Sequence, residues 1–286
     1  MSRTCVALVL VLAACGDDGA STDAGVDADR ARTDLVPAIG SPDTLDVACW
    51  NLRMFPGDVE AGTLVGDLIA SMQLDVVAVQ EIENKSAFEA AIARLPGWQL
   101  AMPDAAGSAT GGIALAWNTG VVQSISTDVI ADARLIRPIV RGVFEVNAQQ
   151  FALHAVHLKA GTQAADEAAR IEAVAVVEGE VRSIVDTTAV DRVLVLGDFN
   201  EDFDDPRADE MFAVFTADRY AVISRSVDDA GGVTFLPANV MLDQMVATTA
   251  LAPAASTPII PPLAQQLPDY RTRVSDHVPL VVKLAL

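Results

Sequence analysis

The chain has few cysteines, few basic residues and no long apolar run, and each shortage narrows what it can be. Three of the 286 residues are cysteine, and only Cys49 lies beyond residue 15. The chain after residue 15 therefore cannot form an internal disulfide, and Cys49, inside an apolar run, is expected to be a buried thiol. No apolar stretch reaches the ~20 residues that a membrane-spanning helix needs.

Basic residues are outnumbered. The chain carries 19 Lys and Arg against 39 Asp and Glu, for a formal net charge of −20. This balance argues against non-specific attraction to nucleic acid phosphates, and any affinity for duplex DNA should be weak and strongly salt-sensitive. It does not exclude a phosphate substrate, because a divalent cation held by carboxylates inverts the local field.

The first 15 residues resemble an export signal. Arg3 precedes the apolar run Val6 to Leu12, which then meets Ala13, Ala14 and Cys15. Such a run is too short to span a bilayer and is typical of a signal peptide. The stretch LAAC resembles the lipobox of bacterial lipoproteins, which implies cleavage before Cys15 and lipid attachment to it. The alternative is an ordinary signal peptide with a cysteine nearby.

The lipobox resemblance implies an exported protein anchored in the bacterial cell envelope. Gly16 stands where an Asp would signal retention in the inner membrane, so the outer membrane or the cell surface is favoured. Residues 16–42 are rich in Asp, Ala and Gly without a hydrophobic period, and we expect an acidic, disordered tether there. The domain proper is expected at 43–286.

Strand and helix patterns alternate along the rest of the chain, of which hydrophobic residues make up 51%. Apolar runs predict strands near 45–50, 75–80, 111–117, 121–125, 142–146, 151–158 and 192–199, and helical spacing predicts helices over 59–72, 85–95 and 164–184. The Pro-rich stretch 250–268 is predicted to be a surface loop. Adjacent strands mixed with strand–helix units favour an α/β fold with two packed sheets and helices outside.

Polar residues gather at the ends of these apolar runs. They include oxygen donors suited to a hard divalent cation and a histidine with an ordinary pKa near neutrality, which suits a general base. The chemistry this set favours is metal-assisted hydrolysis of a phosphate ester. The candidates are Asn51, Glu81, His157, Asp198, Asn200, Asp243, Asp276 and His277.

The order of these residues carries a family resemblance. WN at 50–51, QE at 80–81, HLK at 157–159, GDFN at 197–200, LDQ at 242–244 and SDH-P at 275–279 resemble the motifs of the endonuclease/exonuclease/phosphatase superfamily, the deoxyribonuclease I-like group. The resemblance covers nearly all of 45–286. It implies a four-layered α/β/β/α sandwich of two mostly antiparallel sheets flanked by helices, with Mg²⁺, or Mn²⁺ or Ca²⁺ in its place, at one end of the sheets.

The same resemblance assigns roles. Asn51 and Glu81 would bind the metal, and Asp276 would support the metal and the base. His157 would contact the scissile phosphate, while Asp198 and Asn200 would position the attacking water and the phosphate. Asp243 would orient His277, the general base that activates water. These are assignments by motif, and His154 has no counterpart among them and is expected to be structural.

Three functions remain open from the sequence. The first is a nuclease-like phosphodiester hydrolase acting as a monomer, with nucleic acid as one candidate substrate and the membrane touched only through the lipid anchor. The second is a phosphoesterase for phospholipids or inositol phosphates, against which Glu201 and Asp202 follow GDFN in place of the aromatic and Arg of the inositol phosphatase branch. The third is a non-catalytic surface-binding lipoprotein.

Overall fold

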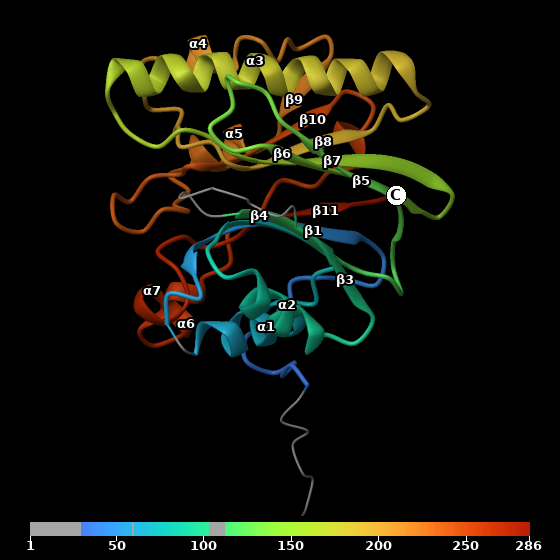
Figure 1. Cartoon of the computed structure of the whole chain (residues 1–286), viewed down its shortest axis with the longest axis vertical. Coiled ribbons are helices and arrows are strands. Elements are labelled where there is room, and N and C mark those ends of the chain that lie inside the picture. Colours follow the sequence, from blue (N-terminus) through green and yellow to red (C-terminus); the bar gives the residue numbers. More distant parts are fainter. Residues whose placement is uncertain (1–29, 59, 103–111) are drawn as a thin grey trace, which may run out of the picture.

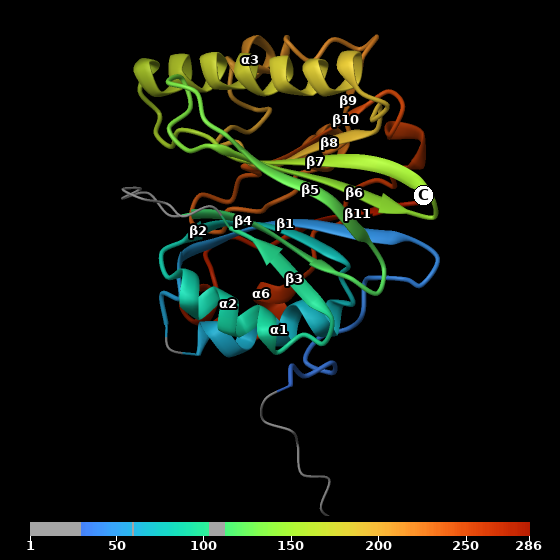
Figure 2. The ribbon, with the colours of Figure 1, turned by 45° about the vertical axis from the view of Figure 1, so that its right-hand side comes forward.

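Two β-sheets pack face to face, with helices covering both outer faces (Figures 1 and 2). This is seen in a computed structural model, which describes residues 30–58, 60–102 and 112–286. One sheet has five strands in the order β11-β1-β2-β4-β3, and the other has six in the order β5-β6-β7-β8-β10-β9. The four-layered α/β sandwich predicted from the sequence is confirmed.

The elements are as follows. The five-stranded sheet consists of β1 (Leu45–Phe55), β2 (Val76–Ile82), β3 (Trp98–Ala101), β4 (Gly112–Asn118) and β11 (Leu280–Leu284). The six-stranded sheet consists of β5 (Gln123–Ile130), β6 (Ile139–Val146), β7 (Gln149–His157), β8 (Val193–Asp198), β9 (Tyr220–Val222) and β10 (Asp243–Thr248). The helices are α1 (Ala61–Met72), α2 (Lys85–Ala93), α3 (Ala164–Thr187), α4 (Ala208–Phe212), α5 (Arg225–Asp228), α6 (Leu263–Gln266), α7 (Tyr270–Arg273) and the 3₁₀ turn η1 (Ala252–Ala254).

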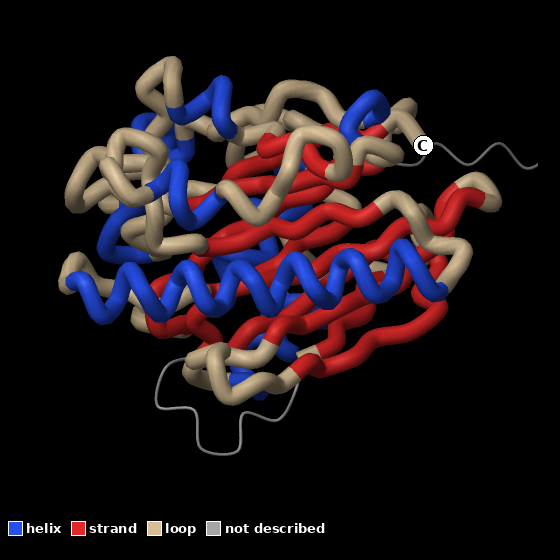
Figure 3. Tube along the Cα trace, turned by 90° about the horizontal axis from the view of Figure 1, so that it is seen from above, coloured by secondary structure: helices blue, strands red, loops and turns tan. Residues whose placement is uncertain are grey.

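Most neighbouring strands are antiparallel, and the two exceptions position the site. The pairs β1–β2 and β7–β8 are parallel. Each pair is joined through a helix, α1 in the first case and α3 in the second, because a parallel connection must cross back over the sheet. Figure 3 shows α3 lying lengthwise over the strands of the six-stranded sheet. The carboxyl ends of both parallel pairs carry candidate site residues.

The alternation of side chains divides the core into three clusters. Between the sheets, Val47 and Cys49 of β1 share a buried cluster with Leu194 and Leu196 of β8. The other face of the five-stranded sheet packs on α1 and α2, and the other face of the six-stranded sheet packs on α3 and α4. Cys49 is buried and free, as expected from the sequence.

Residues 30–42 differ from the prediction. We expected a solvated tether up to residue 42, but residues 30–42 lie against α1 and α2. The Ala31 amide donates to the Arg94 carbonyl at 3.1 Å, the Leu35 amide donates to Ser71 Oγ at 2.9 Å, and Val36 is 7% exposed. The tether prediction is therefore wrong for this stretch, because Leu35 and Val36 bring apolar surface that α1 can cover.

Three further outcomes concern the rest of the chain. Strand β3 was not predicted, and the predicted loop 250–268 contains η1 and α6. The predicted signal peptide, Cys15 and residues 16–29 lie outside the described residues. Within the described ranges, no helix combines the length and the apolar character that crossing a membrane requires.

Candidate active site

The predicted site residues meet at one edge of the sandwich because they continue its inward faces. Alternation puts His157 on the same face of β7 as Leu153 and Ala155, which belong to the core between the sheets. Asp198 follows Leu196 on β8 in the same way. Polar groups replace the apolar core where the strands end, so the site is a polar continuation of that core.

Strand register brings the residues of the six-stranded sheet together. Asp198 lies beside His157 in the parallel pairing of β7 and β8. On its other side, Asp198 lies opposite Asp243 in the antiparallel pairing of β8 and β10. Three residues far apart in sequence are therefore neighbours across three adjacent strands.

Glu81 reaches the site only through an irregular backbone. Regular alternation would place it on the helix-facing side of β2, with Val77 and Val79. Its φ of 62° is left-handed, and the pairing of β2 with β4 shifts register between Val79 and Ile82. A bulge of this kind re-aims a side chain, and a left-handed non-glycine residue costs of order 1 kcal/mol or more. The left-handed backbone conformation at Glu81 turns its carboxylate toward Asn51.

A cluster of metal-ligating groups results, in which His157 and Asp198 are buried and Glu81 is half-buried. Ligand atoms of Glu81, His157 and Asp198 all lie within 4.8 Å of one another. His157 Nε2 is 3.5 Å from Asp198 Oδ2 and 3.8 Å from Glu81 Oε1. Burial raises the pKa of Asp198, although His157 and His277 act in the opposite direction. Two carboxylates held this close, one of them buried, fit a divalent cation, which would relieve their mutual repulsion.

Asn51 ties the two carboxylates together. Its Nδ2 donates to Glu81 Oε1 at 3.0 Å and to Asp198 Oδ2 at 2.9 Å, while its Oδ1 accepts from the Arg53 amide at 2.9 Å. In this arrangement Asn51 presents nitrogen to the carboxylates. It can serve as the metal ligand that the motif implies only if the amide turns over.

Asp276 stands slightly apart from this cluster. It lines the same cavity, but its carboxylate pairs with Arg53 Nε at 3.4 Å. The structure thus groups Glu81 with His157 and Asp198, and Asp276 is not part of that group. Its assignment to the metal remains a prediction.

His277 and Asp243 form the predicted pair. His277 Nδ1 is 2.8 Å from Asp243 Oδ2, and its Nε2 is 3.9 Å from Asp198 Oδ2. Burial by itself would lower the pKa of His277, but the charge of Asp243 and its hydrogen bond, with the charges of Asp198 and Asp276, raise that pKa to about 9. One ring nitrogen is held by Asp243 and the other faces the metal-ligating cluster.

Several residues outside the recognised chemistry hold this pair in place. Thr234 Oγ1 accepts hydrogen bonds from the amides of Leu242 and Asp243, both at 3.1 Å. The His277 carbonyl accepts from Tyr270 Oη at 2.7 Å and from Trp50 Nε1 at 3.2 Å. Sequence reasoning missed Tyr270, which stands in none of the motifs, and gave Trp50 no role beyond the WN motif.

Ser275 links the backbone of Asn51 to the backbone of His277. Its Oγ donates to the Asn51 carbonyl at 2.7 Å and accepts from the His277 amide at 3.0 Å. The serine stands in the SDH-P motif, so the signal was present, but its partner could not be read from the sequence.

Asn200 is placed beside the same strand ends. Its φ is 53°, its amide donates to Asp198 Oδ1 at 2.9 Å, and its Nδ2 donates to the Leu158 carbonyl at 3.2 Å. The preceding Gly197 has φ of 144°, and a Cβ there would lie 2.1 Å from the Val156 carbonyl oxygen. The GDFN motif therefore needs its glycine for the close approach of β8 to β7.

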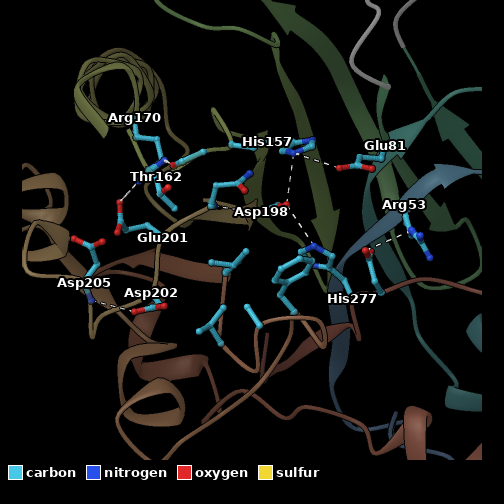
Figure 4. A pocket seen from close by; sticks show the side chains of 18 residues that line it. Arg53, Glu81, His157, Thr162, Arg170, Asp198, Glu201, Asp202, Asp205 and His277 are labelled. Atoms are coloured by element: carbon cyan, nitrogen blue, oxygen red, sulfur yellow. Dashed lines mark hydrogen bonds and ion pairs between the residues drawn. The ribbon is translucent and has the colours of Figure 1, made fainter. Parts of the chain in front are cut away.

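A cavity of about 500 Å³ opens in front of these groups (Figure 4). Six carboxylates line it against two guanidinium groups, those of Arg53 and Arg170, and both of these are ion-paired. In Figure 4, Asp198 lies in the middle, with Glu81 and Arg53 on one side and Glu201, Asp202 and Asp205 on the other. The cavity is thus acidic well beyond the metal-ligating cluster.

The comparisons with known proteins agree with this geometry. The family model described as "Endonuclease/Exonuclease/phosphatase family" matches residues 48–277. The chain belongs to this family. It is therefore a member of a superfamily of hydrolases that depend on divalent metal ions, and the cluster of Glu81, His157 and Asp198 supplies a possible metal site. A search of the curated proteins by sequence finds no match.

Solved structures share the endonuclease/exonuclease/phosphatase fold at low sequence identity. The human Nocturnin catalytic domain with a bound sulfate is 16% identical, with a TM-score of 0.63 over 84% of this chain and 94% of that one. TDP2 of D. rerio, complexed with a single-strand DNA product, is 16% identical, with a TM-score of 0.64 over 84% and 98%. A mannosyl-6-phosphatase of Bacteroides thetaiotaomicron is 16% identical, with a TM-score of 0.63 over 84% and 99%.

Proposed function

We propose that this chain is a divalent-metal-dependent phosphodiester hydrolase in which His277 activates the attacking water. One observation carries the proposal. Asp243 holds Nδ1 of His277 at 2.8 Å, and Nε2 of His277 lies 3.9 Å from Oδ2 of Asp198, a member of the metal-ligating cluster. A base held by a carboxylate and aimed at a metal-ligating cluster is the arrangement that water attack on a bound phosphate requires.

The chain's residues divide the work. In its neutral form His277 takes the proton from water at Nε2, and Asp243 stabilises the imidazolium that forms. Asn200 and His157 offer donors to the phosphate oxygens. A divalent cation held by Glu81 and Asp198, with Asn51 and Asp276 as further candidates, would polarise the phosphate and neutralise developing charge. Mg²⁺ suits these oxygen donors, and Mn²⁺ can bind the same donors.

Two observations bear on the substrate class. A nuclease-like activity follows from the family motifs, and one structural neighbour was solved with a DNA product. The excess of carboxylates in the cavity disfavours a long polyanion. A compact phosphodiester is therefore the first substrate to test, with single-stranded and duplex DNA as the second and third.

An assay panel tests the proposal. The purified chain is incubated with a generic phosphodiester, duplex and single-stranded DNA, RNA, a phosphomonoester and sphingomyelin, each with Mg²⁺, Mn²⁺, Ca²⁺ or EDTA. We expect turnover of at least one diester, loss of turnover in EDTA and recovery with excess metal. Turnover that persists in EDTA would contradict the metal-dependent mechanism, and turnover of the monoester alone would correct the reaction class.

We further propose that the chain is exported and anchored through a lipid on Cys15, with the domain acting as a monomer at the outer membrane or the cell surface. The support is the order of Arg3, the apolar run and LAAC in the first 15 residues. Expression with radiolabelled palmitate tests it: the wild type should be labelled and Cys15→Ser should not. Equal labelling of both would rule out Cys15 as the site.

A further inference from the structure

A buried ion pair borders the catalytic cavity on the side away from Glu81 (Figure 4). Arg170 of α3 and Glu201, just after the GDFN motif, are each 3% exposed at the side chain. Arg170 Nε and Nη2 both approach Glu201 Oε2 at 2.9 Å. Burying two charges is costly unless their hydrogen bonds are satisfied, so a pair in this place calls for an explanation.

The remaining donors of Arg170 fasten a different segment. Its Nη1 donates to the Lys159 carbonyl at 3.1 Å and to the Gly161 carbonyl at 2.7 Å. One guanidinium therefore joins the loop after β7 to the segment after β8. A planar fork of donors can hold three acceptors at fixed angles, which an ammonium group cannot do.

These two segments carry the groups assigned to the phosphate. His157 is the last residue of β7, two positions before Lys159, and Asn200 directly precedes Glu201. They also contact each other directly, since the Leu158 amide donates to the Asp198 carbonyl at 2.9 Å and Asn200 Nδ2 donates to the Leu158 carbonyl at 3.2 Å. The ion pair of Arg170 and Glu201 adds a second link between the same two segments.

We propose that Arg170 and Glu201 are a positioning pair that fixes the loop after β7 against the segment after β8, and so sets His157 and Asn200 for catalysis. The role in turnover rests on the function proposed above. Neither side chain needs to touch the reacting atoms, and their effect passes through the backbone of both segments.

The chain offers a matched control pair. Arg94 and Asp67 form an ion pair at 3.0 Å with side chains 18% and 5% exposed, and Arg94 also donates to the carbonyls of Thr63 and Arg30. This second clamp has the same chemistry, but neither of its residues lines the catalytic cavity. A merely structural role for Arg170 and Glu201 would make the two pairs behave alike.

The test compares R170M/E201L with R94M/D67L in the full chain. Replacing both partners by apolar residues avoids leaving a charge buried alone, so the fold should survive. We expect kcat of R170M/E201L to fall about 10–100-fold, the scale found for residues that orient catalytic groups, with KM and the melting temperature near wild type. R94M/D67L should keep the wild-type kcat. R170K, which keeps the charge and loses the fork, should lose kcat as well and serves as the test should the double variant not fold.

Hydrogen exchange gives a readout independent of turnover. The amides of Leu158 and Asn200 should exchange roughly tenfold faster in R170K than in wild type, while core amides of β7 keep their protection. Unchanged exchange at both amides, or a kcat that falls only as far as the control pair's, overturns the positioning role. If wild type turns over none of the esters tested, the proposed function fails, and the exchange result still decides whether the clamp exists.

Discussion

Strand β7 carries two histidines three residues apart, and they lie in different regions of the molecule. His157 faces the space between the sheets, where Asp198 and Glu81 approach its Nε2. His154 faces α3, is 0% exposed, and neither of its ring nitrogens has a hydrogen-bond partner among the described residues. Burial lowers the pKa of both, to about 4 for His157 and about 3 for His154.

Burial therefore lowers the histidine pKa in both regions. Only in the region of His157 and Asp198 do carboxylates oppose that effect, and at His277 they outweigh it. At the strand ends, His277 is as buried as His157, yet Asp243, Asp198 and Asp276 raise its pKa to about 9. Beside α3, the charge of Arg141 lowers the pKa of His154 further. At the site, buried titratable groups have opposite charges close by. Substituting a histidine there should lower activity, whereas substituting His154 beside α3 should change it little.

The sharpest contrast comes from removing the base. His277→Ala should lower kcat about 10²–10⁴-fold, the contribution of a positioned general base. Initial rates on the diester identified by the assay panel measure it, with circular dichroism as the check on folding. His154→Ala is the matched substitution in the other region and should leave kcat within the error of wild type. A His277→Ala enzyme with more than a tenth of wild-type turnover would exclude His277 as the base.

A pH series on the metal-free protein tests the Asp243 contact. The folded pKa of His277, about 9, lies above its ordinary 6.5, so its proton stabilises the fold fully below pH 6.5 and this stabilisation is lost as pH rises toward 9. The loss should be on the order of 2–3 kcal/mol, measured by urea unfolding in EDTA at pH 6, 7, 8 and 9.

Asp243→Asn should flatten that slope, because it removes the charge that keeps the proton on His277. His277→Asn removes the titrating group itself and should be flat too. A wild-type slope that survives in Asp243→Asn would mean that another group titrates in this window.

Metal affinity should depend on Glu81 and not on Glu83. Glu81→Gln removes one charge from the cluster with Asp198 and His157, and should weaken Mn²⁺ binding about tenfold or more, which is 1.4 kcal/mol. Glu83→Gln, an exposed change two residues away, is the control. Titration calorimetry measures both, and equal affinities in the two variants would move the metal away from Glu81.

Much of this arrangement was predictable from the sequence, for identifiable reasons. Apolar periodicity placed the strands and the long helix α3, and the motifs at the strand ends identified the residues that now meet around Asp198. Their convergence follows from strand register, which carries all side chains of one parity to one face. The sequence also separated His154 from the site correctly, since no motif claimed it.

What could not be predicted depends on contacts between distant segments. Nothing in QE at 80–81 announces the left-handed turn that swings Glu81 from the helix side of its sheet toward Asn51. The clamp of Arg170 on Glu201 joins residues 31 positions apart, and the packing of residues 30–42 on α1 is a tertiary effect in a stretch without hydrophobic periodicity. Local pattern carries no information on such pairings.

The smallest expected effect concerns the other histidine. The folded pKa of His154, about 3, lies below its ordinary 6.5, so the unfolded chain takes up a proton that the folded protein refuses, and stability is lost as pH falls from 6.5 toward 3. His154→Leu should remove this acid sensitivity and also the cost of two unpartnered nitrogens, giving about 1 kcal/mol more stability at pH 7. Urea unfolding at pH 7 and pH 5 measures both changes, with kcat unchanged. A less stable His154→Leu protein would show that His154 has a partner, such as a bound water. His154 and His157 would then both have polar partners, and the contrast between the two regions of β7 would be smaller.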